Sequence, residues 1–159
     1  MKIISGGQTG ADRAALDAAI HMNIPHGGWL PRGRKTEDGP LPQHYALLEL
    51  ESDNYRLRTE KNVVAGDGTL IVAFGTLTGG TALTESLAIK YDRPCLVLDL
   101  EQISQSQAVT AAEIWLKRER ISVLNVAGPR ASSEPRIYGA VKNLLLAIDW
   151  ESVEQAGKN

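Results

Sequence analysis

The chain has 159 residues, of which 43% are hydrophobic and 23% are charged, so its composition is that of a globular protein and not of a disordered or fibrous one. Its formal net charge of −2 excludes the strongly basic surface expected of a protein that binds nucleic acid. At roughly 100–200 residues per domain, the length predicts one ligand-binding domain over residues 1–150 and a polar tail over 151–159 that frays.

Short apolar runs alternate with longer amphipathic segments along the whole chain. In chain order they predict strand 2–5, helix 10–22, strand 26–30, helix 54–65, strand 69–74, helix 81–91, strand 95–100, helix 107–119, strand 122–127 and helix 135–148. The last three strands are almost continuously apolar, which is typical of strands covered by helices on both faces. The pattern therefore predicts an α/β fold, with a doubly wound, mainly parallel sheet of about five strands.

The sequence shows no pattern of a metal site, a disulfide or a membrane anchor. Cys95 is the one cysteine, and His21, His26 and His44 are not spaced as zinc ligands. The N-terminal residues meet glycine before the apolar core of a signal peptide can form, and no apolar stretch reaches the roughly 18 residues of a membrane span. These observations predict a cytoplasmic protein with neither a membrane nor a nucleic-acid partner.

A first glycine cluster, residues 5–13, connects a predicted strand to a predicted helix. At such a junction, backbone N–H groups and the helix dipole can hold an anion. The cluster departs from the dinucleotide fingerprint because Ser5 replaces its first glycine, and from the Walker pattern because Ala11 and Asp12 follow its last glycine. Helix capping by Thr9 is the alternative role of this segment. The ligand-binding candidates here are Gly6, Gly7, Gln8, Thr9, Gly10 and Asp12.

A second cluster, residues 75–85, follows the most apolar strand and adds hydroxyl groups to the glycines. Because the carboxyl ends of parallel strands meet at one edge of a sheet, both clusters are expected to face one crevice. The candidates are Thr76, Thr78, Gly79, Gly80, Thr81 and Glu85. The threonines have turn formation and helix capping as alternatives. Glu85 is the candidate catalytic residue, with a solvated carboxylate near the helix start as its alternative.

Two further loops supply basic side chains. Gly128, Arg130 and Ser132 follow the last predicted strand, and arginine offers paired donors and permanent charge to a phosphate. Solvation at the surface is the alternative role of Arg130. The irregular segment 31–42 is too long and too rich in proline and glycine for a simple connector, so a functional loop containing Arg32 is expected there.

Several blocks of the sequence, in order, are similar to the molybdenum carrier family, whose members resemble molybdenum cofactor carrier proteins. The blocks are GGQTGADRAALD (residues 6–17), GGWLP (27–31), RTEKNV (58–63), DGTLI (67–71) and TGGT (78–81), and they span about half the chain. The family is more distantly similar to lysine-decarboxylase-like phosphoribohydrolases and to DNA-processing protein A. The resemblance implies a Rossmann-like fold, a phosphorylated ligand over the glycine loops and a homo-oligomer.

The resemblance leaves the reaction open. The phosphoribohydrolases carry P-G-G-x-G-T-x-x-E, but when Glu85 is aligned with that glutamate, Ala82 stands at the threonine and Thr78 at a glycine. We therefore expect a binding protein for a phosphate-bearing small molecule, either molybdenum cofactor or a nucleotide, with no direct protein ligand to the metal. A nucleotide N-glycosidase that uses Glu85 and a nucleotide-sensing regulatory domain are the alternatives.

Overall fold

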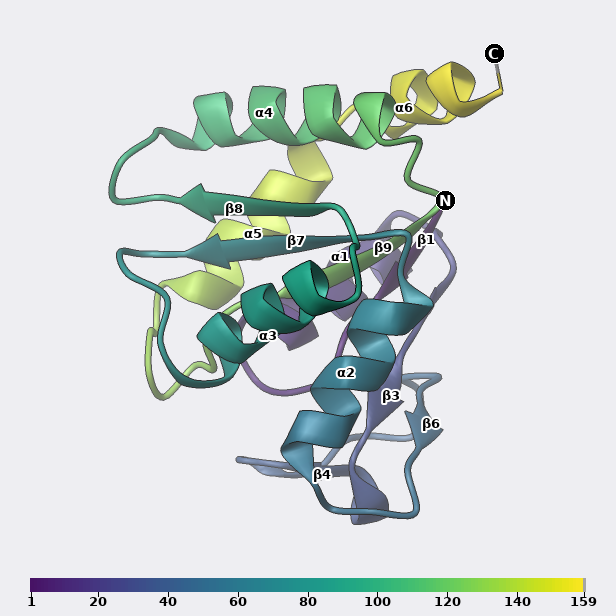
Figure 1. The fold of residues 1–159 in the computed structure, drawn as a ribbon, viewed down its shortest axis with the longest axis vertical. Coiled ribbons are helices and arrows are strands. Elements are labelled where there is room, and N and C mark those ends of the chain that lie inside the picture. Colours follow the sequence, from purple (N-terminus) through teal and green to yellow (C-terminus); the bar gives the residue numbers. More distant parts are fainter. Residues whose placement is uncertain (159) are drawn as a thin grey trace.

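The computed structural model describes residues 1–158 and contains a central five-stranded parallel sheet with helices on both faces (Figure 1). The strand order is β2-β1-β9-β7-β8. The strands are β1 (Lys2–Ile4), β2 (His26–Gly27), β7 (Gly68–Ala73), β8 (Cys95–Asp99) and β9 (Val123–Ala127). The helices are α1 (Ala11–His21), α2 (Tyr55–Ala65), α3 (Gly79–Lys90), α4 (Gln105–Arg118), α5 (Ile137–Ala147) and α6 (Trp150–Gly157). The doubly wound α/β fold is thus confirmed.

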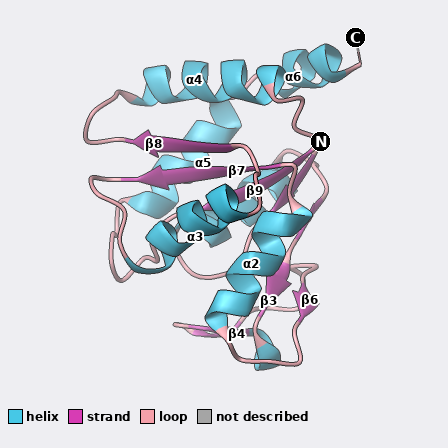
Figure 2. Cartoon of the chain, in the orientation of Figure 1, coloured by secondary structure: helices cyan, strands magenta, loops and turns pink. Residues whose placement is uncertain are grey.

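The two faces of the sheet are covered by different helices. Two connections, from β1 to β2 and from β8 to β9, run in the same direction across the sheet. Their helices, α1 and α4, share one buried cluster with α5. Connections β2 to β7 and β7 to β8 run the other way, and α2 and α3 cover the opposite face (Figures 1 and 2). This division follows from the right-handedness of parallel crossovers.

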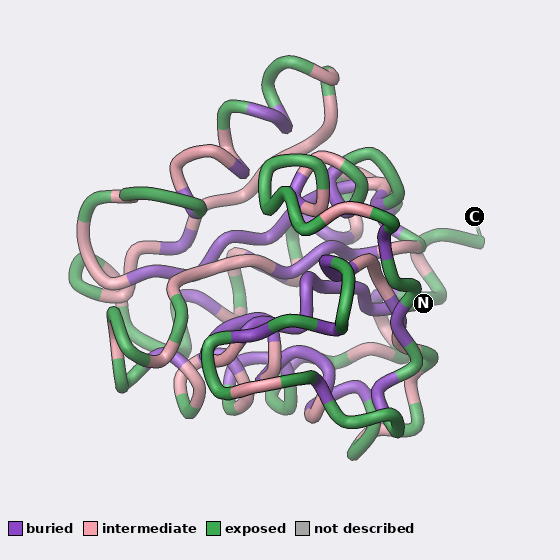
Figure 3. Tube along the Cα trace, turned by 90° about the horizontal axis from the view of Figure 1, so that it is seen from below, coloured by how far each residue is buried: buried purple, intermediate pink, exposed green. Residues whose placement is uncertain are grey.

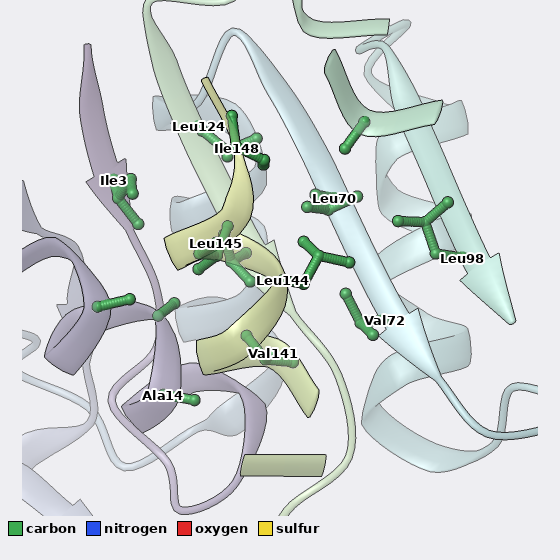
Figure 4. Packing of buried hydrophobic residues seen from close by; sticks show 14 of the residues in the cluster. Ile3, Ala14, Leu70, Val72, Leu98, Leu124, Val141, Leu144, Leu145 and Ile148 are labelled. Carbon is green, nitrogen blue, oxygen red and sulfur yellow. The ribbon is translucent and has the colours of Figure 1, made fainter. Parts of the chain in front are cut away.

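The main core lies between the sheet and the α1–α4–α5 layer. Leu70, Val72 and Leu124 of the sheet pack against Val141 and Leu144 of α5 and their neighbours (Figure 4). A row of alanines along one face of α1 lets that helix pack closely on the core, because alanine side chains are small. All six residues of β7 are buried, and the buried trace in Figure 3 runs through the centre of the molecule. This rigid sheet fixes the positions of the loops at its edge.

One predicted strand is divided in two. Residues 26–30 form β2 and then β3 (Trp29–Leu30), which leaves the main sheet and pairs with β6 (Leu48–Glu49). Gly28 lies between them with φ 128°, and a Cβ on it would lie 2.0 Å from the carbonyl oxygen of Ser5. The chain therefore turns away from the sheet at a position that only glycine accommodates.

The segment that follows is folded. It contains a short 3₁₀ helix, η1 (Arg32–Arg34), and a hairpin of β4 (Lys35–Thr36) with β5 (Gly39–Pro40). The buried Arg34 guanidinium donates to the carbonyl oxygens of Leu41 (2.8 Å) and Tyr45 (2.8 Å). These bonds hold the segment against the domain as an ordered structure.

The C-terminal residues form a helix where the sequence predicts a fraying tail. The Asp149 carboxylate caps α6 by accepting from the N–H of Ser152, and Val153 is buried against the core. The N-terminal ammonium lies 2.9 Å from Glu154. The two ends are therefore neighbours at the edge of the sheet opposite the arrowheads of the strands (Figure 1). Within residues 1–158, no helix has both the length and the apolarity needed to cross a bilayer.

Candidate functional site

A cavity opens where the connections leave neighbouring strands on opposite faces. β7 leads to α3 on one face, whereas the adjacent β9 leads to α5 on the other. Open α/β sheets bind ligands in the crevice at such a switch point. The cavity here has a volume of about 220 Å³. It is lined by Gly6, Gln8, Asp12, Arg58, Thr59, Asn62, Thr78, Gly79, Gly80, Thr81, Thr84, Asn125, Val126, Ala127, Gly128, Pro129, Arg130 and Ser133.

The N-terminus of α3 presents free donors to this cavity. Thr78 is the N-cap, and its side chain makes no capping bond. Its carbonyl oxygen accepts from the N–H groups of Thr81 (3.1 Å) and Ala82 (3.3 Å). The N–H groups of Gly79 and Gly80 have no acceptor among the described residues, as expected in the first turn of a helix. With the helix dipole, these groups favour an anion at this wall.

The first glycine loop is different, because several of its backbone donors are directed to protein acceptors. The N–H of Gly7 donates to Ser5 Oγ (3.3 Å) and that of Thr9 to Gln8 Oε1 (3.0 Å). The N–H of Ala11 donates to the Pro129 carbonyl oxygen (3.2 Å). Gly7 and Thr9 are ligand-binding candidates by sequence, and in the structure their N–H groups stabilise the loop, whereas those of Gly6 and Gly10 have no acceptor among the described residues.

The first loop instead positions an ion pair on the cavity wall. Asp12 Oδ2 accepts from the N–H of Gln8 (3.3 Å) and from Arg58 Nη1 (3.3 Å). Arg58 Nη1 also donates to the carbonyl oxygen of Gly6 (3.1 Å). Burial raises the pKa of Asp12 above its ordinary value, and this effect outweighs the lowering by Arg58 and by the N–H of Gln8. The pair brings a buried carboxylate and a guanidinium from distant parts of the chain to one wall.

Other polar side chains of the cavity are buried and face it from the sheet and from α2 and α3. Asn125 is 3% exposed, and its Nδ2 donates to Thr69 Oγ1 (3.2 Å), which leaves its Oδ1 without a partner among the described residues. Thr59 and Thr84 donate to backbone carbonyl oxygens within their own helices, which leaves their oxygens as acceptors. Asn62 is held by both backbone polar groups of Trp29 (2.9 Å each).

The structure brings many of the candidate residues from the sequence analysis together. Those that line the cavity are Gly6, Gln8, Asp12, Thr78, Gly79, Gly80, Thr81, Gly128 and Arg130. Those that lie outside its lining are Gly7, Thr9, Gly10, Arg32, Thr76, Glu85 and Ser132. The exposed Arg32 guanidinium donates instead to the Glu51 carbonyl oxygen. Glycine is required at position 10 (φ 82°) because the chain following Gly128 approaches closely, with the Pro129 carbonyl oxygen 2.5 Å from where a Cβ would lie.

The candidate catalytic Glu85 faces another part of the molecule. Burial raises the pKa of the Cys95 thiol to about 11, and the nearby charge of Glu85 adds to this shift. Cys95 packs against the cluster of Val63, Leu87 and Ala88 between α2 and α3. Glu85 lies outside the cavity lining, whereas Thr81 and Thr84 of the same helix belong to it.

The α2 side chains of the cavity and Asn125 are not among the candidates predicted from the sequence. Arg58 and Asn62 are four residues apart, so they share one helix face, and Thr59 lies beside them. The block of residues 58–63 was part of the family resemblance, which was a usable signal. Asn125, a buried amide inside an apolar strand, was another.

The fold and cavity define a doubly wound α/β protein with a polar cavity at its switch point. Residues 3–148 match the circularly permutated YpsA SLOG family, and the chain belongs to that family. A solved structure, "Putative molybdenum carrier protein" from Syntrophus aciditrophicus SB, is 55% identical over 91% of both chains, with a TM-score of 0.90. None of the curated proteins matches the chain.

Proposed function

We propose that the protein binds a phosphate-bearing small molecule in this cavity, with the phosphate at the N-terminus of α3. The observation that carries the proposal is the pair of unpartnered N–H groups of Gly79 and Gly80, which open into the cavity lined also by Arg58 and Arg130. Backbone donors, a helix dipole and guanidinium groups are the chemistry that holds phosphate in proteins.

The cargo that best fits the relatives is molybdenum cofactor. The solved relative is named for carrying molybdenum, and it aligns over most of this chain. Among residues 1–158, no three His, Cys, Asp or Glu side chains gather as metal ligands. The protein would therefore hold such a cargo by its phosphate and organic ring, with the metal bound by the sulfurs of the cargo. The cavity is smaller than the roughly 300–1,000 Å³ of most small-molecule sites, so part of a pterin or a nucleotide would extend beyond it.

The buried Asp12 supports a second candidate function, which is hydrolysis of the glycosidic bond of a nucleotide. A carboxyl group with a raised pKa in a cavity is suited to general acid chemistry. In this alternative Asp12 takes the place that the sequence analysis gives to Glu85. Incubation of the purified protein with AMP tests for this activity. Release of adenine by the wild type but not by Asp12→Asn supports hydrolysis, whereas no release of adenine by the wild type supports binding alone.

The binding proposal is tested with the variant Gly80→Asp. A Cβ at Gly80 meets no atom within 4 Å, and an aspartate in the first turn is favourable for a helix, so the fold is retained. Its carboxylate would repel a phosphate, and we expect calorimetry to show at least about a tenfold loss of affinity for orthophosphate and AMP. The matched control is Ser86→Asp, which adds the same charge to the exposed face of α3.

Native mass spectrometry of the purified protein, before and after denaturation, identifies what it carries. A copurifying pterin supports the molybdenum cargo, and a nucleotide supports the nucleotide-binding alternative. Equal phosphate affinity in the wild type and Gly80→Asp would overturn the placement of phosphate at α3.

A further inference from the structure

A carboxylate of the chain itself occupies a ring of hydrogen-bond donors beside the cavity. Glu37, at the turn of the β4–β5 hairpin, accepts from the Ser132 N–H (3.2 Å) and the Ser132 hydroxyl (2.6 Å). It also accepts from the Thr9 hydroxyl, and Arg130 Nη1 lies 3.9 Å from it. The hydroxyls of Ser132 and Thr9 are the main reason that the pKa of Glu37 is lowered. We call Thr9, Arg130 and Ser132 the Glu37 cradle.

The Glu37 cradle is built from the loops that follow two adjacent strands. Thr9 belongs to the loop after β1, and Arg130 and Ser132 belong to the loop after β9. The N–H of Ala131 donates to Thr9 Oγ1 (3.2 Å), which joins the two loops. Arg130 also lines the main cavity, so the cradle and the cavity share a wall. An anionic group in the cradle would therefore adjoin a ligand in the cavity.

The hairpin has other attachments that do not use the Glu37 carboxylate. The backbone N–H of Glu37 donates to Gln8 Oε1 (2.9 Å). Asp38 accepts from Arg13 at 3.0 and 3.1 Å. The side chains of Glu37 and Arg130 are 21% and 47% exposed, so their contact is at the surface and is screened by solvent. The carboxylate can leave while the hairpin stays anchored.

We propose that the Glu37 cradle is a second anion subsite, and that Glu37 fills it until a ligand with two anionic groups displaces the carboxylate. This inference rests on the proposed function, since one anionic group of the ligand is placed at α3 and the other in the cradle. Hydroxyls, a backbone N–H and a guanidinium bind carboxylate and phosphate oxygens by the same hydrogen bonds. The cradle thus favours ligands such as diphosphates over single phosphates, and the Glu37 carboxylate weakens this preference by competing for the cradle.

The test compares wild type with Glu37→Ala and Glu37→Gln by calorimetry, using pyrophosphate and tripolyphosphate against orthophosphate. Removal of the internal competitor is expected to raise the affinity for pyrophosphate and tripolyphosphate about tenfold if the carboxylate occupies the cradle about nine-tenths of the time. Orthophosphate, held at α3, is expected to change less than about twofold. Glu49→Ala, which removes an exposed carboxylate of β6, is the control and leaves all three affinities unchanged.

Hydrogen exchange supplies a second measurement on the wild type. Pyrophosphate removes the carboxylate's bonds to the loops, which are one of the attachments of the hairpin, so it is expected to speed exchange in residues 35–40 modestly, and orthophosphate is not. Unchanged or weaker pyrophosphate binding in both Glu37 variants, with orthophosphate still bound, overturns the second subsite and leaves the proposed function standing. Absence of phosphate binding in the wild type and in every variant overturns both.

Discussion

At the scale of single residues, the position of the Arg58 side chain in the cavity depends on Gly6. Arg58 reaches Asp12 and the carbonyl oxygen of Gly6 only because its guanidinium passes directly over Gly6. A Cβ on Gly6 would lie 1.9 Å from Nη1 and 2.7 Å from Cζ of Arg58. Gly6 is therefore required for the position of the Arg58 side chain.

We expect Gly6→Ala to displace Arg58 from the cavity wall. Asp12 would then remain buried without its partner, which costs about 1–3 kcal/mol of the free energy of unfolding, and phosphate affinity would fall about tenfold. Chemical denaturation and calorimetry measure the two effects. Gly139→Ala in α5 is the control, because a Cβ there meets no atom within 4 Å, and it should not lower stability. Wild-type affinity in Gly6→Ala would show that Arg58 does not contact the ligand.

At the scale of elements, the β4–β5 hairpin is joined to α1 by one ion pair. Asp38 accepts two bonds from Arg13, and the hydrogen bonds from Arg13 and Thr36 lower the pKa of its carboxyl group to about 2. Because this pKa is below the unfolded value of 3.8, the pair stabilises the folded state fully above about pH 4. Its contribution is lost as the pH falls from about 4 to 2.

Asp38→Asn is expected to lower the free energy of unfolding by about 0.5–1 kcal/mol at pH 6, since the Asp38 side chain is 55% exposed and solvent screens the pair. The difference from wild type should shrink as the pH falls toward 2 and vanish below it, where the Asp38 carboxyl group is protonated and, like asparagine, uncharged. Urea denaturation at several pH values measures this trend. Asp53→Asn, in an exposed position, should show no such dependence. A constant difference at all pH values would mean that shape, and not charge, holds the hairpin.

The elements of the main sheet could be predicted from sequence, whereas the small ones could not. β7, β8 and β9 have five or six residues each and are strongly apolar, so their composition alone marks them. β3 to β6 have two residues each, too few for a periodic pattern. The split at Gly28 depends on contact with Ser5, which is 23 positions away in the sequence and leaves no local signal.

The cavity could be predicted in part for a related reason. Its glycine and threonine loops lie directly after strands, where parallel sheets bind ligands, so Thr78–Thr81 and Gly128 could be found. Arg58 and Asn62 come from a helix that precedes β7, and only the three-dimensional crossing of α2 over the sheet brings them to the site. Glu85 was placed by distance along the chain, but it lies one turn of α3 beyond Thr81, farther from the helix N-terminus and outside the cavity lining.

At the scale of the whole molecule, the order of the strands is a rearranged form of a common one. Numbered along the chain, the five strands of the main sheet have the spatial order 2-1-5-3-4. If numbering starts at β7 and continues through the joined ends, the same sheet has the order 2-1-3-4-5 of flavodoxin-like folds. The cavity then lies between strands 1 and 3, at the switch point of that fold.

The contact between the N-terminal ammonium and Glu154 makes this rearrangement reversible in the laboratory. Residue 158 is four residues beyond Glu154, so a short glycine–serine linker reaches from it to residue 1. We expect a chain opened between Ala65 and Gly66 and closed by this linker to fold and to bind phosphate within about threefold of wild-type affinity. Circular dichroism and calorimetry measure both, and a folded permutant without binding would contradict this expectation. A permutant that binds would mean that the ligand site depends on which strands are neighbours in the sheet. The order in which the ribosome synthesises those strands would then not matter for the site.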